Sequence, residues 1–77
     1  MEWRERITAN PEVLVGKPVV RGTRLSVELI VSLLGNGWTF EEILASYPGL
    51  SVDDIRACLL YAAEVLTEER LYPVVTG

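Results

Sequence analysis

Three cations stand close together in the segment GKPVVRGTRLS, residues 16–26 of a 77-residue chain whose formal net charge is −4. Lys17, Arg21 and Arg24 have the side-chain type and spacing that suit contacts with nucleic-acid phosphates. For Arg24 a second interpretation stays open, an ion pair with a helix acid that fixes this segment. With Arg56, the cation of the expected third helix, they form our candidate DNA-binding set.

Charge is distributed unevenly along the chain. Residues 1–24 carry five cations against three anions, whereas residues 25–77 carry two against eight. Such asymmetry is typical of a molecule whose two ends meet different partners. We therefore expect a basic end for phosphates and an acidic helical end for a basic protein.

The residues for catalysis or metal binding are missing. The chain contains no histidine, the commonest general base and metal ligand. Its single cysteine, Cys58, falls in an apolar helical pattern, which favours an inert core thiol over a nucleophile. Paired acids at helix starts are typical of charges that complement the helix dipole. We predict no enzyme, no catalytic residue, no metal and no cofactor.

Apolar spacing predicts three helices between residues 26 and 67. Ser26 caps the first, which stops at Gly35-Asn36-Gly37. The second opens with a capping box, Thr39 to Glu42, and ends at Pro48; the third begins at Ser51.

The preceding region has a strand pattern. In VLVGKPVV two β-branched runs flank Gly16-Lys17, which predicts a two-residue hairpin loop, and Pro18 predicts an edge strand. The sequence therefore predicts a single domain, 1–77, of mainly α class. An extended β-ribbon at 6–25 precedes the three-helix core at 26–67, and a C-terminal tail follows at 68–77.

The second and third helices, with the Pro48-Gly49-Leu50 turn between them, match a helix-turn-helix pattern. Asp53 and Asp54 open the would-be recognition helix and would repel phosphates. Spacing thus favours DNA binding while charge opposes it, and both interpretations stay open here.

Apolar content exceeds what one small core can hide, since 49% of the residues are hydrophobic and the mean hydropathy is +0.26. We therefore expect a homodimer and a partner surface. The candidate surface residues lie off the main apolar stripes or add negative charge: Leu29, Leu33, Leu60, Tyr61, Glu64 and Glu68. The charged start, the short apolar runs and the lone cysteine predict a cytoplasmic protein without a membrane segment.

Two segments, ITANPEVLVGKPVVRGTRLSVELI and GWTFEEILASYPGLSVDDIRACLLYAA, together resemble a family of small prokaryotic proteins. That family is a domain of unknown function with a homeodomain-like helix-turn-helix fold, and its members are often encoded beside a PIN-like nuclease. The most specific pieces include Asn10-Pro11, Gly16-Lys17-Pro18, Gly22-Thr23-Arg24 and Tyr47-Pro48. The resemblance implies that this chain is the antitoxin-like partner of such a ribonuclease in a toxin-antitoxin pair. From the acidic helical end we expect it to neutralise the ribonuclease by occlusion, and from the cations we expect contacts with operator DNA. A stand-alone dimeric DNA-binding regulator is the alternative.

Overall fold

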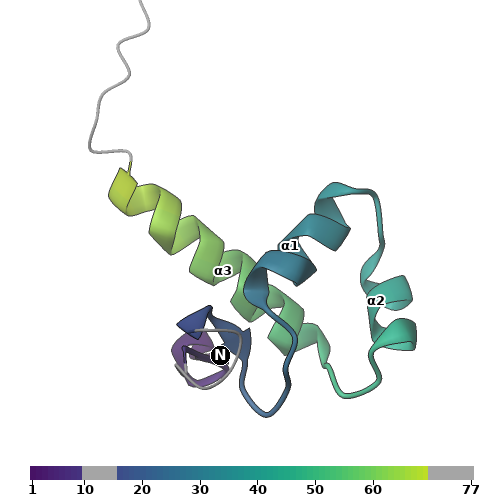
Figure 1. Cartoon of the computed structure of the whole chain (residues 1–77). Coiled ribbons are helices and arrows are strands. Elements are labelled where there is room, and N and C mark those ends of the chain that lie inside the picture. The colour runs from purple at the N-terminus through teal and green to yellow at the C-terminus, as the bar shows by residue number, and fades with distance from the viewer. Residues whose placement is uncertain (10–15, 70–77) are drawn as a thin grey trace, which may run out of the picture.

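The protein is mainly helical, with three helices and a short N-terminal ribbon of two antiparallel strands (Figure 1). The computed structural model describes residues 1–9 and 16–69, without the side chains of residues 68 and 69. This architecture confirms the predicted fold class. In chain order the elements are the 3₁₀ helix η1 (Trp3–Glu5), β1 (Ile7–Thr8), β2 (Val19–Val20), α1 (Val27–Gly35), α2 (Phe40–Ser46) and α3 (Val52–Glu69).

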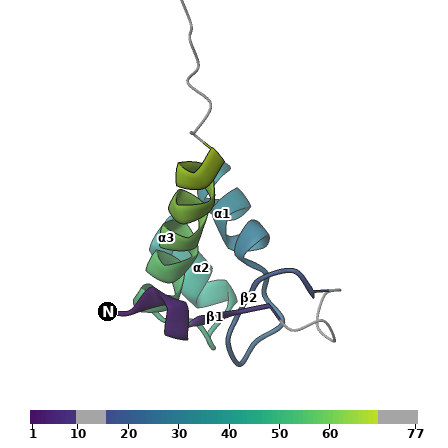
Figure 2. The same cartoon turned by 90° about the vertical axis from the view of Figure 1, so that its left-hand side faces the viewer.

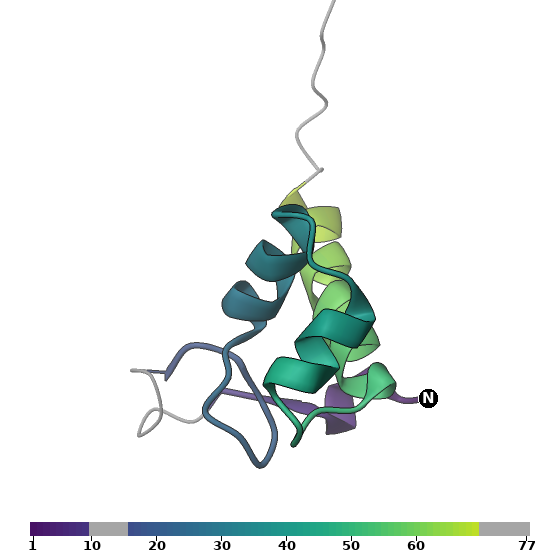
Figure 3. The same cartoon turned by 90° about the vertical axis from the view of Figure 1, so that its right-hand side faces the viewer.

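The longest helix, α3, contacts η1, β1, α1 and α2. In Figure 1 its C-terminal end extends away from α1 and α2. Figure 2 shows the ribbon at one end of the helices, and Figure 3 shows α1 and α2 together on one side of α3. Because α3 reaches Glu69, helix continues past the expected boundary at residue 67. The rest of the predicted tail, residues 70–77, lies outside the described residues.

Both ends of α1 form as the sequence predicts. The Ser26 hydroxyl accepts a hydrogen bond from the backbone N–H of Leu29 at 3.0 Å. At the other end Gly37 has a φ of +95°, which glycine adopts at little cost. Its N–H donates to Leu34, and the N–H of Trp38 donates to Leu33, so two terminal carbonyls are satisfied.

The other two helices begin with capping boxes. Thr39 Oγ1 accepts from the Glu42 N–H at 3.1 Å, and Glu42 Oε1 accepts from the Thr39 N–H at 2.8 Å. Ser51 and Asp54 make the same reciprocal pair at the start of α3, at 3.2 and 2.9 Å. Asp54 therefore has a capping role. From the sequence we expected it only to complement the helix dipole.

The described ribbon joins strands far apart in the chain. β2 pairs with β1, in the register Ile7 to Val20 and Thr8 to Val19. The run at 13–15, which the predicted hairpin pairs with β2, lies outside the described residues. On its other side Val19 makes one isolated bridge with Ser26. Within the described residues the sheet has only the two strands β1 and β2, so β2 is an edge strand, as Pro18 predicts. Gly16 does have the positive φ, +82°, that a turn there requires.

The core draws on the ribbon and all three helices. Ile30, Ile43 and Ile55 come one from each helix, and β2 adds Val19 and Val20. Because Val19 and Val20 are buried, the ribbon is part of the hydrophobic core. Burying such a side chain contributes roughly 1.5–3 kcal/mol to the stability of the folded chain. Within the described residues, none of the helices is long and apolar enough to cross a membrane.

Candidate protein-binding surface

Arg6 ties the N-terminal segment to the start of α3. Its guanidinium donates to Asp54 Oδ1 at 3.0 Å and lies 3.7 Å from Asp53 Oδ2. The Asp54 side chain is only 14% exposed, so this ion pair is partly shielded from water. Both acids that open α3 thus have a cation from their own chain.

Two further contacts hold η1 on the same helix. The rings of Trp3 and Tyr61 meet edge to face, with their centroids 5.9 Å apart. Arg4 lies 3.4 Å from Glu64 and 3.3 Å from Glu2. Hydrogen bonding to the backbone N–H of Arg4, with help from its charge, lowers the pKa of Glu2 below its ordinary value.

These contacts change the meaning of the charge asymmetry. We expected the basic and acidic ends to meet different partners, but Arg4 and Arg6 of the basic end pair with acids of α3. Chain folding brings the two regions together, which composition alone does not show. Arg4 and Arg6 were absent from our candidate residues, and their paired spacing in WRER was the available signal.

The four candidate DNA-binding cations are all exposed. Lys17 Nζ lies 3.2 Å from Glu28, and Arg21 Nε donates to the carbonyl of Glu5 at 2.7 Å. Arg56 lies 4.0 Å from Asp53 on α3. Within residues 1–9 and 16–67, Arg24 makes no side-chain ion pair or hydrogen bond, so the structure gives no support to its proposed pairing with a helix acid.

The predicted partner residues divide into two groups. Leu33 and Tyr61 are partly buried and pack against the core, and Leu29 is half-buried. Leu60 is 43% exposed and Glu64 is exposed. The side chain of Glu68 lies outside the described residues.

One face of α3 presents apolar side chains to solvent. We call this face the outer strip and define it as Val52, Arg56, Leu59, Leu60 and Ala63, all of them exposed. Its three large apolar side chains are 38%, 39% and 43% exposed, in chain order. Sequence reasoning missed Val52 and Leu59, although their seven-residue spacing places them on one helix face.

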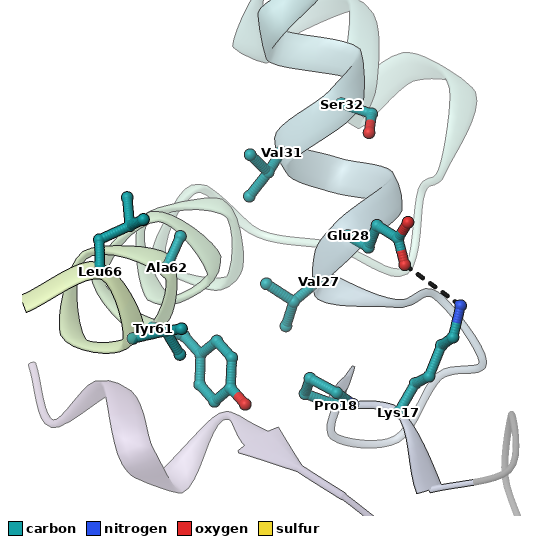
Figure 4. Close-up of a pocket in the computed structure, with 10 residues that line it drawn as sticks. Lys17, Pro18, Val27, Glu28, Val31, Ser32, Tyr61, Ala62 and Leu66 are labelled. Atoms are coloured by element: carbon teal, nitrogen blue, oxygen red, sulfur yellow. Dashed lines mark hydrogen bonds and ion pairs between the residues drawn. The ribbon is translucent and has the colours of Figure 1, made fainter. Parts of the chain in front are cut away.

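A groove of about 410 Å³ lies between α1 and the C-terminal half of α3 (Figure 4). Val27 and Val31 project from α1 toward α3. The α3 side of the groove consists of Tyr61, Ala62, Val65 and Leu66, and Pro18 with the Lys17–Glu28 pair and Ser32 completes the lining.

Cys58 has no access to solvent. Burial raises the pKa of this thiol from 9.0 to about 12, and the negative charge of Asp54 adds to the shift. The thiolate required for nucleophilic chemistry is therefore disfavoured at neutral pH. The prediction of a core thiol is confirmed.

Comparison with known protein families finds one whose sequence model matches most of the chain. Residues 7–62 match the family described as "Protein of unknown function (DUF433)". This chain belongs to the DUF433 family. The match includes the ribbon, α1, α2 and most of α3, whereas η1 and the end of α3 lie outside it.

Two known proteins are similar to this chain. An uncharacterized protein of Sinorhizobium fredii, y4eO, is 39% identical over 59 residues, which are 77% of this chain and 27% of that protein. The crystal structure of a DUF433 member from Anabaena variabilis has a TM-score of 0.76 and 32% identity. That likeness covers 82% of this chain and 62% of the crystallised one. This chain therefore spans about a quarter of one relative and under two thirds of the other.

Proposed function

We propose that this DUF433 protein is a binding module that neutralises a PIN-like ribonuclease toxin by covering its RNA-binding surface. The outer strip of α3 carries the proposal. Leu59 and Leu60 form a compact apolar pair in solvent, the kind of surface that anchors a protein partner once water is excluded. A nucleic-acid surface would instead be basic, and Arg56 is the strip's only cation.

Electrostatics favours a basic partner beside this strip. Glu64 lies on the same half of α3, and its pair with Arg4 joins side chains that are 48% and 60% exposed. Exposed pairs contribute little stability, so Glu64 can exchange its partner at small cost. The RNA-binding rim of a PIN-like nuclease must be basic around its metal-holding carboxylates, which makes it complementary to an acidic helix.

The test is to look for a PIN-like nuclease gene next to the gene of this chain, and to co-express and co-purify the two proteins. We expect the intact chain to co-purify with the nuclease and restore growth. The double change Leu59→Ala and Leu60→Ala should weaken the complex at least about tenfold, because it removes two anchors. Calorimetric titration of the purified proteins measures the affinity.

The matched control is Trp38→Ala. Trp38 is 36% exposed and lies between α1 and α2, outside the outer strip. Trp38→Ala should leave the affinity for the nuclease unchanged. Circular dichroism should show native helix content in this variant and in the double variant of Leu59 and Leu60. An intact chain that neither binds the nuclease nor relieves its toxicity would rule out the antitoxin function.

A second candidate function is operator binding, supported by the helix-turn-helix order of α2 and α3 and by the exposed Arg24. If the chain binds its promoter DNA, the affinity should depend on the cations near the ribbon. Replacing Lys17, Arg21 and Arg24 with Ala should weaken binding and flatten its dependence on salt. Fluorescence anisotropy across a salt series measures both effects, and binding lost only with Arg56→Ala would place DNA on α3 instead.

A further inference from the structure

The stretch of α3 from Ala57 to Leu66 is apolar over much of its circumference. At 100° per residue, Leu60 and Ala63 of the outer strip point away from Val65 on the groove side, and Leu66 lies between the two sides. In residues 57–63, ACLLYAA, seven apolar residues follow one another. A helix that is apolar all round is normally buried on all sides. The body of this chain covers only part of this stretch of α3, and Leu66 remains 64% exposed.

The walls of the groove have the spacing that a packed helix requires. Val27 and Val31, four residues apart, make one wall on α1; Ala62 and Leu66, also four apart, make the other on α3. Side chains spaced in this way form ridges into which a third helix can pack. Tyr61 and Pro18 line the same groove beside these walls, and the polar groups are confined to Lys17, Glu28 and Ser32.

We propose that the groove receives the C-terminal half of α3 from a second copy of this chain, so that two chains form a symmetric dimer. The apolar helix half and the groove are adjacent on the same molecule. A two-fold axis that places one α3 in the partner's groove also places the partner's α3 in the first groove. One symmetric contact therefore covers the exposed apolar part of α3 and the groove on both chains.

Charge supports a second copy as the occupant. Between Arg56 and Arg70 every charged residue of the chain is acidic, so the incoming helix is negative. Lys17 stands at the rim of the groove, and its pair with Glu28 joins side chains that are 61% and 72% exposed. Lys17 can thus approach an acid of the partner while giving up little, because so exposed a pair contributes little stability.

A stable dimer would need only a modest part of this chain's surface. A standard stable interface buries roughly 800 Å² on each partner, about a seventh of this chain's 5360 Å² surface. Two α1 helices and two α3 helices would then share one apolar centre. Such an addition matters for a small domain, whose own core is marginal.

The experiment is sedimentation equilibrium of the full chain at micromolar concentrations. The unaltered chain should be a dimer, and Leu66→Glu should weaken dimerisation at least about tenfold, because it places a carboxylate in an apolar groove. Leu66 is so exposed that the folded monomer tolerates the change. The matched control is Leu60→Glu on the outer strip, which should stay dimeric.

A second measurement locates the contact directly. Chains carrying Val31→Cys are mixed with chains carrying Leu66→Cys and oxidised. The proposed dimer gives a disulfide between the two kinds of chain, and buried Cys58 gives none. Since Leu60→Glu impairs the nuclease contact and Leu66→Glu the dimer, the two proposals fail separately.

Three results would overturn the dimer proposal. The first is a full chain that is monomeric at these concentrations. The second is a dimer that Leu60→Glu disrupts and Leu66→Glu does not, which would assign the contact to the outer strip. The third is a monomer whose Leu66→Glu variant loses nuclease binding, which would assign the groove to that protein.

Discussion

At the scale of single residues, Cys58 makes the free energy of unfolding depend on pH in the alkaline range. The folded thiol keeps its proton until about pH 12, whereas the ordinary value for an accessible thiol is 9.0. Between these values the unfolded chain binds fewer protons than the folded one, so the free energy of unfolding falls as pH rises. We expect urea midpoints to decrease from pH 9 upward, and to decrease less steeply in Cys58→Ala.

The control for this prediction is thiol reactivity. Ellman's reagent should react slowly with the native chain at pH 8 and rapidly in urea, because only unfolding exposes the sulfur. Equal rates in the two conditions would show that Cys58 is accessible in the folded protein. Parallel pH profiles for the unaltered chain and Cys58→Ala would remove this thiol as the source of the slope.

At the scale of elements, Arg6 should be the main polar link between the N-terminal segment and α3. Arg6→Gln removes the charge that faces Asp53 and Asp54, and we expect a loss of about 1 kcal/mol in the free energy of unfolding. Urea denaturation measures it. Lys17→Gln, which breaks a much more exposed pair, should cost less than about half as much. Equal losses would contradict a special role for the Arg6 contact.

Local signals predicted the elements well. Ser26, Thr39 and Glu42 act where the sequence places them, because capping depends on residues within a few positions of each other. Gly37 ends α1 for the same local reason. The pairing of β2 with β1 was not predicted, because strand pairing depends on residues far apart in the chain and Ile7–Thr8 offers only two residues of pattern.

The candidate site was harder to predict than the helices. Leu33 and Tyr61 seemed to be surplus apolar residues, but the Trp3 ring covers part of Tyr61 and the core takes up part of Leu33. Val52 and Leu59 were not among the predicted surface residues, yet they are exposed because no element of the described chain lies over that face. Periodicity shows which residues share a face, and packing decides which face is covered.

At the scale of the whole molecule, folding determines which charges remain available to a partner. The N-terminal cations and the acids of α3 compensate one another where η1 lies on the helix. This leaves the far side of α3 with apolar groups and a single cation, so the exposed surface is less polar than the charge count suggests. Net charge describes the protein at a distance, whereas this mainly apolar face determines close contact.

The position of η1 against α3 also sets the order of events during synthesis. Residues 3–6 leave the ribosome before their partners at 53–64, which follow some fifty residues later. Until then Trp3 has no ring to pack against, and Arg6 has no acid from α3. Contacts between such distant positions close large loops and form late, so docking of the N-terminal segment completes folding rather than starting it.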